Sequence, residues 1–273
     1  TLLITAREVP ALIADARIRG VTLTGSTAAG RAVAALAGAA LKPCVLELGG
    51  SDAYVILEDA DLDHAAETCA AARLINAGQS CISAKRLIVA GKIRRDFEKR
   101  LVARMKARHP GDPADPRTVL GPLARHDLRD ELHAQVQRSL RRGARLLLGG
   151  TVPPGPGWFY PPTVLTGVKP GMPAYGEELF GPVAAVIPVR DEAEAVAVAN
   201  DTPYGLGAAV FSRNRPRARE TARQLEAGMV FINDFVRSDP SLPFGGVKHS
   251  GLGRELGRPG LLAFTNQKTL WLG

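Results

Sequence analysis

The sequence has 273 residues, of which 45% are hydrophobic and 23% charged, a balance typical of a folded globular protein of about two domains. Its apolar runs are too short to cross a bilayer, and its three cysteines form no C-x-x-C pair, so we expect no membrane span, disulfide framework or zinc site. The net charge of +8 lies in short clusters at helical spacing beside only 5% aromatic residues, which favours solvated helix faces over a nucleic-acid-binding surface.

Helical and strand patterns alternate along the chain, which predicts an α/β fold. In the first part, a helix is predicted over 7–18, and a small-residue helix over 26–41 can be capped by Ser26 or Thr27. The strands predicted around it span 20–25, 43–50 and 52–57. The first strand follows a helix with no strand before it, as if the chain began inside a sheet that started earlier.

Further along, a helix with an acidic first turn is predicted over 61–78 and an amphipathic helix over 94–107. Two loops rich in Pro and Gly are predicted at 109–123 and 151–164, and a third, glycine-rich loop at 243–257. The remaining helices are predicted in the first part of 125–150 and over 191–200 and 215–228. The remaining strands are predicted at 86–91, the end of 125–150, 181–189, 206–212, 229–233 and 268–272.

Cys81 ends the hexapeptide NAGQSC, in which Gly78 and Gln79 give the thiol polar surroundings that the segments around Cys44 and Cys69 lack. Because a glycine lets the backbone come close to a ligand, Cys81 is a candidate nucleophile. A small buried hydrophobe is the ordinary alternative for any cysteine, and the hexapeptide alone leaves both interpretations open.

Glu47 stands inside the apolar strand run CVLELGG, just before two glycines. Acidic residues are almost never buried unless they are paired, so an outward-facing position on the strand is one interpretation. The other is a carboxyl group in a cleft at the C-terminal end of a strand, where ligands of open α/β sheets bind. Desolvation there would raise the pKa of Glu47 and suit it to act as a general base.

Two further turns are weaker signals. TGSTAAG, at 24–30, joins a strand to a helix whose N-terminus could face a phosphate. It is neither G-x-G-x-x-G nor a P-loop, because Arg31 and Ala32 replace the Lys-Ser/Thr pair. EELFGP, at 177–182, places two acids and a Phe before a Gly-Pro turn, and alone it reads as an ordinary loop.

Together, TGSTAAG, LELGG, NAGQSC, EELFGPV, ANDTPYGLGAAVF and PFGGVKHSGLGRELG occur in the order and spacing of the NAD(P)-dependent aldehyde dehydrogenase superfamily, which the sequence resembles over nearly its whole length. The resemblance implies an NAD or NADP cofactor and oxidation of an aldehyde to the acid. Cys81 would attack the aldehyde, its backbone N–H would help hold the oxyanion, and Glu47 would activate water against the thioester.

Matching positions carry further implications of this resemblance. Asn76 matches an Asn that commonly precedes the nucleophile, and Phe244 lies in the loop that lines the substrate tunnel. The positions that match cofactor contacts are Gly25, Ser26 and Gly30 beside the pyrophosphate, Leu48 and Gly49 against the nicotinamide, Glu178 at the nicotinamide ribose and Phe180 beside it.

The resemblance also implies a fold of the aldehyde dehydrogenase kind. Residues 1–48 would be the end of a Rossmann-type nucleotide domain, 49–250 an α/β catalytic domain, and 251–273 a return segment with an oligomerisation strand. That strand would pair across subunits in a homodimer or homotetramer. We expect a cytoplasmic protein, because no basic-then-apolar leader opens the sequence and the thiols suit a reducing compartment. No metal is expected, since metal-ligand spacing is absent among His64, His109, His126, His133 and His249.

Several alternatives stay open. The resemblance begins in the middle of the family pattern, and the residues that select NAD or NADP lie before that point. A chain truncated there would be inactive as a dehydrogenase and at most a weak thiol esterase or an oligomerisation piece, which binding of NAD(P) would discriminate. The segment 237–256 is similar to bacterial succinate-semialdehyde dehydrogenases, yet Ile75 stands where some members place a carboxylate-binding Arg, so another small aliphatic aldehyde is an equal candidate. An RNA-binding domain has only the charge in its favour.

Overall fold

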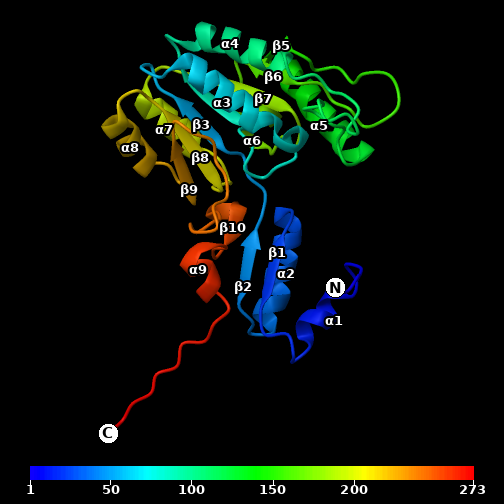
Figure 1. The fold of residues 1–273 in the computed structure, drawn as a ribbon, viewed down its shortest axis with the longest axis vertical. Coiled ribbons are helices and arrows are strands. Elements are labelled where there is room, and N and C mark those ends of the chain that lie inside the picture. The colour runs from blue at the N-terminus through cyan, green and yellow to red at the C-terminus, as the bar shows by residue number, and fades with distance from the viewer. The chain divides into compact units, whose positions relative to one another are not determined.

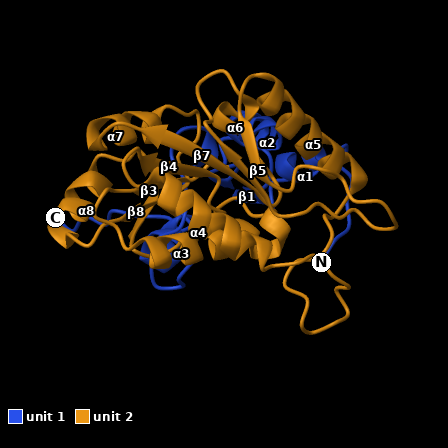
Figure 2. Cartoon of the chain, turned by 90° about the horizontal axis from the view of Figure 1, so that it is seen from above, with its two compact units in different colours: residues 1–49, 238–273 blue, residues 50–237 orange.

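The computed structural model describes residues 1–273 and divides them into two compact units. Unit 1 combines the two ends of the chain, residues 1–49 and 238–273, and unit 2 is formed by residues 50–237 (Figure 2). The roles predicted for 1–48, 49–250 and 251–273, a nucleotide-domain remnant, a catalytic domain and a return segment, stay predictions.

Unit 1 contains a small three-stranded sheet in the order β1-β2-β10 (Figure 1). β1 (Val21–Thr24) and β2 (Cys44–Glu47) are parallel, and β10 (Gly251–Leu252) joins β2 in the antiparallel direction. The helices of the unit are α1 (Val9–Ala14), α2 (Thr27–Ala39), the short 3-10 helix η2 (Lys248–Ser250) and α9 (Gly257–Leu262). Since α2 connects two adjacent parallel strands, β1-α2-β2 is a βαβ unit of the kind from which nucleotide-binding sheets are built.

Unit 2 is built on a seven-stranded sheet in the order β5-β6-β7-β4-β3-β8-β9, in which only β5 is antiparallel to its neighbour. The strands are β3 (Ala53–Ile56), β4 (Arg86–Ala90), β5 (Arg145–Leu148), β6 (Thr163–Thr166), β7 (Val183–Val189), β8 (Gly207–Phe211) and β9 (Met229–Ile232). The central strands are almost fully buried, as their continuous apolar sequences such as AYVI and GAAVF predict for a sheet covered on both faces.

Helices cover that sheet, with α3 and α4 on one face and α7 on the other (Figure 2). The helices of unit 2 are α3 (Leu62–Leu74), η1 (Ile75–Gly78), α4 (Arg94–Lys106), α5 (His126–Arg141), α6 (Pro173–Gly176), α7 (Glu192–Asn200) and α8 (Arg215–Arg223). Side-chain caps fix three of the starts: Asp61, Asp191 and Asn214 each accept a hydrogen bond from the backbone N–H three residues on. Not one of the helices is both long enough and apolar enough to cross a membrane.

The structure corrects several predicted elements. The loop predicted over 151–164 is wrong at its end, because β6 begins at Thr163, and the short helices α6 and α9 were not predicted. The helix predicted over 61–78 ends at Leu74, since Asn76 and Ala77 take up left-handed backbone angles that no α-helix can continue through.

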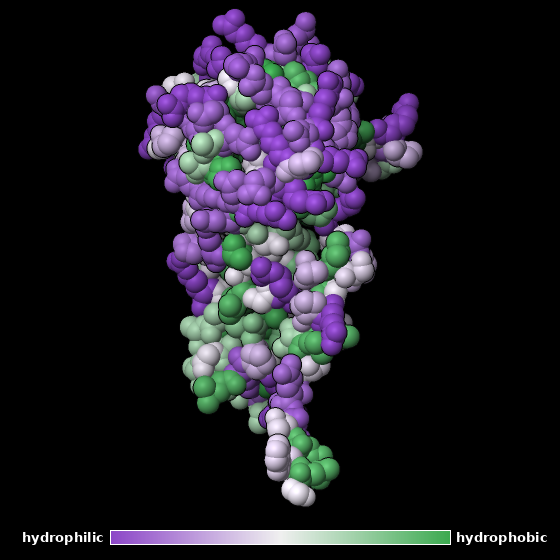
Figure 3. Space-filling view, turned by 90° about the vertical axis from the view of Figure 1, so that its left-hand side faces the viewer, coloured by the Kyte–Doolittle hydropathy of each residue, from purple (hydrophilic) through white to green (hydrophobic).

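Residues 268–272, predicted as a strand that pairs across subunits, form no strand within the single chain, and the pairing stays a prediction. The segment after α9 runs away from the small sheet as an extended chain, coloured red in Figure 1, and no neighbouring strand hydrogen-bonds to it. At its end the side chains are strongly exposed, from 80% for Leu270 to 87% for Trp271, and the space-filling view shows apolar surface at the foot of Figure 3. Because a strand is defined by its ladder, an extended apolar segment on its own remains coil.

Candidate functional site

The loop that carries Cys81 begins where α3 stops. Asn76, Ala77 and Gly78 have φ values of 50°, 54° and 75°, so three consecutive left-handed residues reverse the chain after the helix. Two side-chain hydrogen bonds hold the reversal: Asn76 Nδ2 donates to the Gln79 carbonyl and Gln79 Nε2 to the Asn76 carbonyl, each at 3.1 Å. The hexapeptide NAGQSC is thus a built turn that presents a half-buried Cys81 at its end.

Two glycines let other backbone segments approach this turn. A Cβ on Gly78 would overlap the Gly181 carbonyl, and a Cβ on Gly50 would lie 2.6 Å from the Cys81 carbonyl oxygen. The segment that leads into β3 therefore lies against Cys81, and the turn 177–182 lies against the turn after α3, with no room for a side chain at either contact. The other two cysteines differ: Cys69 is fully buried in α3, where burial raises its pKa far above the usual thiol range, and Cys44 begins β2 in unit 1.

Lys85 lies beneath the Cys81 loop and is a site residue that sequence reasoning missed. Its side chain is 1% exposed, and its Nζ donates to the carbonyls of Ser80 at 2.9 Å and Cys81 at 2.8 Å. The same Nζ lies 3.5 Å from Glu178 Oε1. A lysine directly before the buried strand sequence RLIVA was the one available signal, because a buried ammonium needs acceptors nearby.

The turn 177–182 brings Glu178 to the same place. Glu178 Oε1 accepts from the Gly50 N–H at 3.1 Å, while α5 fixes the turn through Gln135, which donates to Glu177 and to the Glu178 carbonyl. The Glu178 side chain stays 20% exposed, and Phe180 in the same turn is 36% exposed. Within unit 2 the structure thus brings together Cys81 and Glu178, two of the predicted site residues.

Glu47 is the last residue of β2, at the C-terminal end of that strand. It pairs across the sheet with Thr24 on one side and Gly251 on the other, and its side chain is only 3% exposed. Neither carboxyl oxygen has a hydrogen-bond partner. Burial, with a smaller contribution from the negative charge of Glu255, raises the pKa of Glu47 to about 7. The expected outward-facing alternative is therefore wrong for this side chain, and the expected rise in pKa is present.

The other predicted residues of unit 1 gather around the β1-α2 turn. Gly25 N–H donates to the Glu47 carbonyl at 3.0 Å, and Ser26 caps α2 by accepting from the Ala29 N–H at 3.2 Å. A Cβ on Gly30 would lie 2.5 Å from both methyl groups of Leu48, so Leu48 fills the notch that the glycine leaves in α2. The predicted cofactor residues of unit 1 are therefore neighbours in space.

This turn fits part of a dinucleotide. The N-terminus of the 13-residue helix α2 opens directly after a parallel strand, with free backbone N–H groups suited to a phosphate. Gly49 is held beside it, since Ser250 Oγ donates to the Gly49 carbonyl at 2.6 Å and Leu48 N–H donates to the Ser250 carbonyl at 2.9 Å. In unit 2, the partly exposed Glu178 carboxylate suits ribose hydroxyl donors.

Two residues predicted to concern the substrate lie in exposed or half-buried positions. Phe244 is half-buried and forms an antiparallel bridge with Glu255, with two backbone hydrogen bonds of 2.7 Å. Ile75 opens η1 and is 42% exposed, so no buried packing role explains it. No cluster of three or more His, Cys, Asp or Glu side chains has a geometry that could hold a metal ion.

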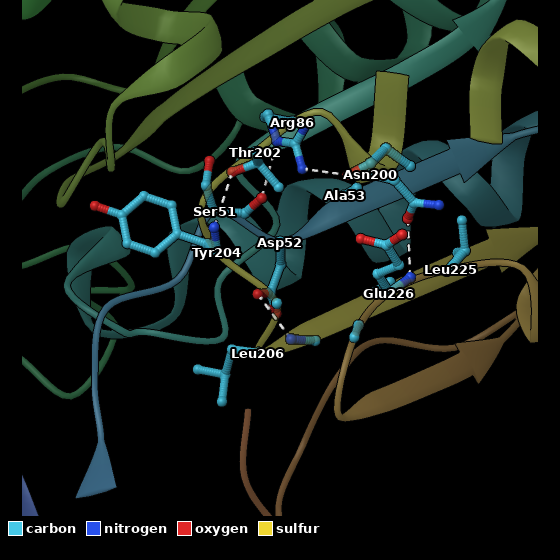
Figure 4. A pocket seen from close by; sticks show the side chains of 15 residues that line it. Ser51, Asp52, Ala53, Arg86, Asn200, Thr202, Tyr204, Leu206, Leu225 and Glu226 are labelled. Atoms are coloured by element: carbon cyan, nitrogen blue, oxygen red, sulfur yellow. Dashed lines mark hydrogen bonds between the residues drawn. The ribbon is translucent and has the colours of Figure 1, made fainter. Parts of the chain in front are cut away.

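A pocket in unit 2 lies at the N-terminal ends of β3, β4 and β8 and is lined among others by Ser51, Asp52 and Arg86 (Figure 4). The Arg86 guanidinium donates hydrogen bonds to three backbone carbonyls, those of Ser51, Val198 and Ala199, at 2.8–2.9 Å. Asp52 Oδ1 accepts from the Gly207 N–H at 3.0 Å, and burial raises the pKa of Asp52 to about 6. These contacts tie the strand ends together around the segment that leads to Cys81.

The model of the aldehyde dehydrogenase family matches residues 3–270 of the chain. Two similar curated proteins are the succinate semialdehyde dehydrogenase [NAD(P)+] Sad of Escherichia coli K12 and the succinate-semialdehyde dehydrogenase [NADP(+)] of Deinococcus radiodurans. Each is 52% identical, over 95% and 98% of the chain respectively, and in both cases over 56% of the relative. The chain thus spans little more than half the length of the curated relatives it matches.

Solved structures give the same picture. The succinic semialdehyde dehydrogenase of Streptococcus pyogenes in complex with NADP+ is 44% identical with a TM-score of 0.96, over 99% of this chain and 60% of that one. An aldehyde dehydrogenase of Mycobacterium tuberculosis complexed with NAD+ is 38% identical with a TM-score of 0.92, over 96% and 55% of the two chains. The fold predicted from the resemblance is confirmed for the part of these structures that the chain spans.

Proposed function

We propose, starting from the fact that the chain belongs to the aldehyde dehydrogenase family, that it carries the nucleophile and the general base of an enzyme that oxidises a small aldehyde to the carboxylic acid with NAD or NADP. The observation that carries this proposal is the state of Glu47. It is a carboxyl at a strand's C-terminal end, buried without a hydrogen-bond partner, with its pKa raised to about 7. Such a group is half ionised near neutral pH, as a general base requires.

In this proposal Cys81 begins the reaction. Its thiolate sulfur attacks the aldehyde carbon, a C–S bond forms, and the carbonyl π electrons move to oxygen as an oxyanion. The Cys81 backbone N–H donates to that oxyanion, and the hydrogen bonds around Asn76 and Gln79 fix the turn beforehand, so little reorganisation is needed. A nicotinamide held against Leu48 and Gly49 would accept the hydride from the adduct carbon, which would leave a thioester on Cys81.

Glu47 then hydrolyses the thioester. Its ionised carboxylate takes a proton from water while the water oxygen attacks the thioester carbon. The tetrahedral adduct collapses with the Cys81 sulfur leaving as thiolate, and the carboxylic acid departs. The hydrogen bond from Gly25 N–H to the Glu47 carbonyl and the Gly251 pairing hold the base in position.

For the cofactor, we assign Gly25, Ser26 and Gly30 to the pyrophosphate, Leu48 and Gly49 to the nicotinamide, and Glu178 with Phe180 to the nicotinamide ribose. The N-terminus of α2 and the partly exposed Glu178 carboxylate support this assignment. Both NAD and NADP stay candidates, because the names of the relatives include NAD(P)+ and NADP+ forms.

For the substrate, succinate semialdehyde is the first candidate, since the similar curated proteins carry that name. Ile75 offers no charge for a substrate carboxylate, so a short aliphatic aldehyde without one is the second. Phe244 is proposed to line the substrate tunnel.

The experiment that tests the function is NAD(P)H formation by the purified chain with each cofactor and both aldehyde classes. Turnover that Cys81→Ala abolishes supports the proposal, and Cys69→Ala is the matched control because Cys69 is fully buried in α3. Glu47→Gln should release one equivalent of NAD(P)H and then stall at the acyl-enzyme. Normal steady-state turnover of that variant would rule out the base role.

A second candidate concerns the chain by itself, which spans 56–60% of the length of its curated relatives. Without further residues for the nucleotide, Cys81 and Glu47 would act as a weak thiol esterase, or the chain would serve only in assembly. Hydrolysis of p-nitrophenyl acetate needs no nucleotide and separates these cases. Cys81-dependent ester hydrolysis without NAD(P)H formation would select the esterase.

We further propose that the chain forms a homodimer or homotetramer in the cytoplasm. The exposed apolar segment 268–272 supports assembly, since an extended apolar strand is a template for pairing with another chain. The three cysteines, none of which is in a disulfide, are in keeping with a reducing compartment.

A further inference from the structure

The buried ammonium of Lys85 occupies a position that the chemistry proposed so far does not use. Its side chain is 1% exposed, and such burial of a charge is costly unless hydrogen bonds and opposite charge compensate it. An ammonium has three donors, and Lys85 has three acceptors: the carbonyls of Ser80 and Cys81 and, at 3.5 Å, Glu178 Oε1. Two of the donors are used by the loop of the nucleophile, and the charge is paired with one carboxylate.

Lys85 is itself held firmly at its backbone. Its N–H donates to the Asp52 carbonyl at 3.3 Å, and its carbonyl accepts from the Ala185 N–H at 3.1 Å, which ties it to the residue before β3 and to β7. The backbone from which the ammonium extends is therefore fixed in the sheet.

Gly50 closes the same group of contacts. Its N–H donates to the Glu178 oxygen that Lys85 approaches, and its missing Cβ is the space in which the Cys81 carbonyl lies, at 2.6 Å from where that Cβ would be. Cys81 and Glu178 thus share two neighbours, Lys85 and Gly50. A displacement of Lys85 would release the Cys81 carbonyl and the Glu178 carboxylate together.

We infer that Lys85 is a positioning residue that couples the peptide of Cys81 to the carboxylate of Glu178 through one buried ammonium. The inference rests on the proposed function for the roles of those two residues, nucleophile and cofactor-ribose ligand. The coupling itself rests only on the contacts of Lys85.

The position of the Lys85 ammonium also has an electrostatic consequence for Cys81. Lys85 places a positive charge beside the backbone of the nucleophile, where it favours the thiolate over the thiol. The other charged groups packed around the loop are Arg73, which donates to the Gly78 carbonyl at 2.5 Å, Arg86 at the start of β4, Asp52 and Glu178. Burial lowers the pKa of Lys85, while the negative charge of Glu178 raises it.

The test is the pH dependence of Cys81 alkylation by iodoacetamide, followed by peptide mass spectrometry so that Cys44 and Cys69 are counted separately. Lys85→Met keeps a similar length and removes the charge. We expect its alkylation midpoint to rise by about one pH unit. Lys85→Arg keeps the charge, so its alkylation midpoint should lie close to that of the unaltered chain. A folded Lys85→Met variant with the midpoint of the unaltered chain would overturn the inference.

Lys42→Met is the matched control. Lys42 Nζ also donates to two backbone carbonyls, those of Ile13 and Asp15, but it belongs to unit 1. Its loss should lower the unfolding temperature without moving the alkylation midpoint. An equal shift in this control would mean that any lost lysine moves the midpoint, and it would count against a positioning role for Lys85.

Glu178→Gln keeps the test decisive if Lys85→Met does not fold. It leaves the ammonium and removes its opposing charge, so the midpoint should fall, and an unchanged midpoint would contradict the coupling. Where both variants fold, the double variant should show non-additive shifts.

Alkylation needs neither cofactor nor aldehyde, so the two proposals can fail separately. Loss of NAD(P)H formation with these shifts intact would contradict the proposed function alone, and turnover without the shifts would contradict the Lys85 inference alone.

Discussion

Gly245 lies directly against the carboxyl group of Glu47: a Cβ at position 245 would be 2.6 Å from Glu47 Oε1. Gly245 also has a φ of 148°, a backbone angle that residues other than glycine rarely adopt. The buried carboxyl, which has no hydrogen-bond partner, thus packs closely against the backbone at Gly245.

Gly245→Ala should therefore displace the Glu47 carboxyl and strain the backbone. We expect a loss of roughly 1–3 kcal/mol in the free energy of unfolding and hydrolysis of the acyl-enzyme slowed on the order of tenfold or more. Chemical denaturation and single-turnover kinetics measure the two effects. Gly38→Ala is the control, because an exposed glycine inside α2 with open space around it should gain up to about 1 kcal/mol.

Glu47→Gln should change how stability depends on pH. The pKa of Glu47 is raised from 4.5 to about 7 by burial, so the folded state binds the proton more tightly than the unfolded state. Its contribution is full below pH 4.5 and is lost as the pH rises through about 7. The variant should gain up to about 3 kcal/mol relative to the original chain between pH 4 and pH 8. Urea denaturation at both pH values measures this gain, and parallel curves for the two proteins would argue against the raised pKa.

Gly78→Ala should damage the turn of the nucleophile. Gly78 has a φ of 75°, and a Cβ there would overlap the backbone of Gly181. A cost of roughly 1–3 kcal/mol is expected, together with slower alkylation of Cys81 at a fixed pH. Gly176→Ala, at the exposed end of α6 with open space around it, should leave both quantities unchanged. Wild-type reactivity in Gly78→Ala would show that the turn tolerates a side chain.

Deletion of residues 268–273 should abolish assembly without unfolding the chain. The segment forms no strand, and Leu270, Trp271 and Leu272 are all at least 80% exposed, so its removal costs little internal packing. Sedimentation velocity should show a dimer or tetramer for the intact chain and a monomer for the deletion. An unchanged sedimentation coefficient would place the assembly surface elsewhere.

Local sequence was enough to predict most elements and the cap of the helix that begins after Ser26. Ser26 and Asp61 begin helices where a short polar residue precedes a helical pattern, because their side chains satisfy N–H groups that the helix leaves open. The apolar runs of β3, β4, β7 and β8 predicted buried parallel strands for a similar reason, since period and composition are local properties. The motifs around Cys81 and Glu47 could be placed in the same way.

Tertiary structure decided what depends on neighbours distant in the chain. β6 follows a Pro-rich loop and becomes a strand only because β5 and β7 pair with it, and 268–272 is coil because no strand pairs with it. Glu47 packs against Gly245, nearly two hundred residues away in the chain, and the ion pair of Lys85 depends on Glu178 in the turn 177–182. Sequence by itself determined which groups are chemically able to act. Burial and hydrogen-bond partners, which set the pKa and orientation of those groups, are properties of packing between distant segments, and only the folded chain decided them.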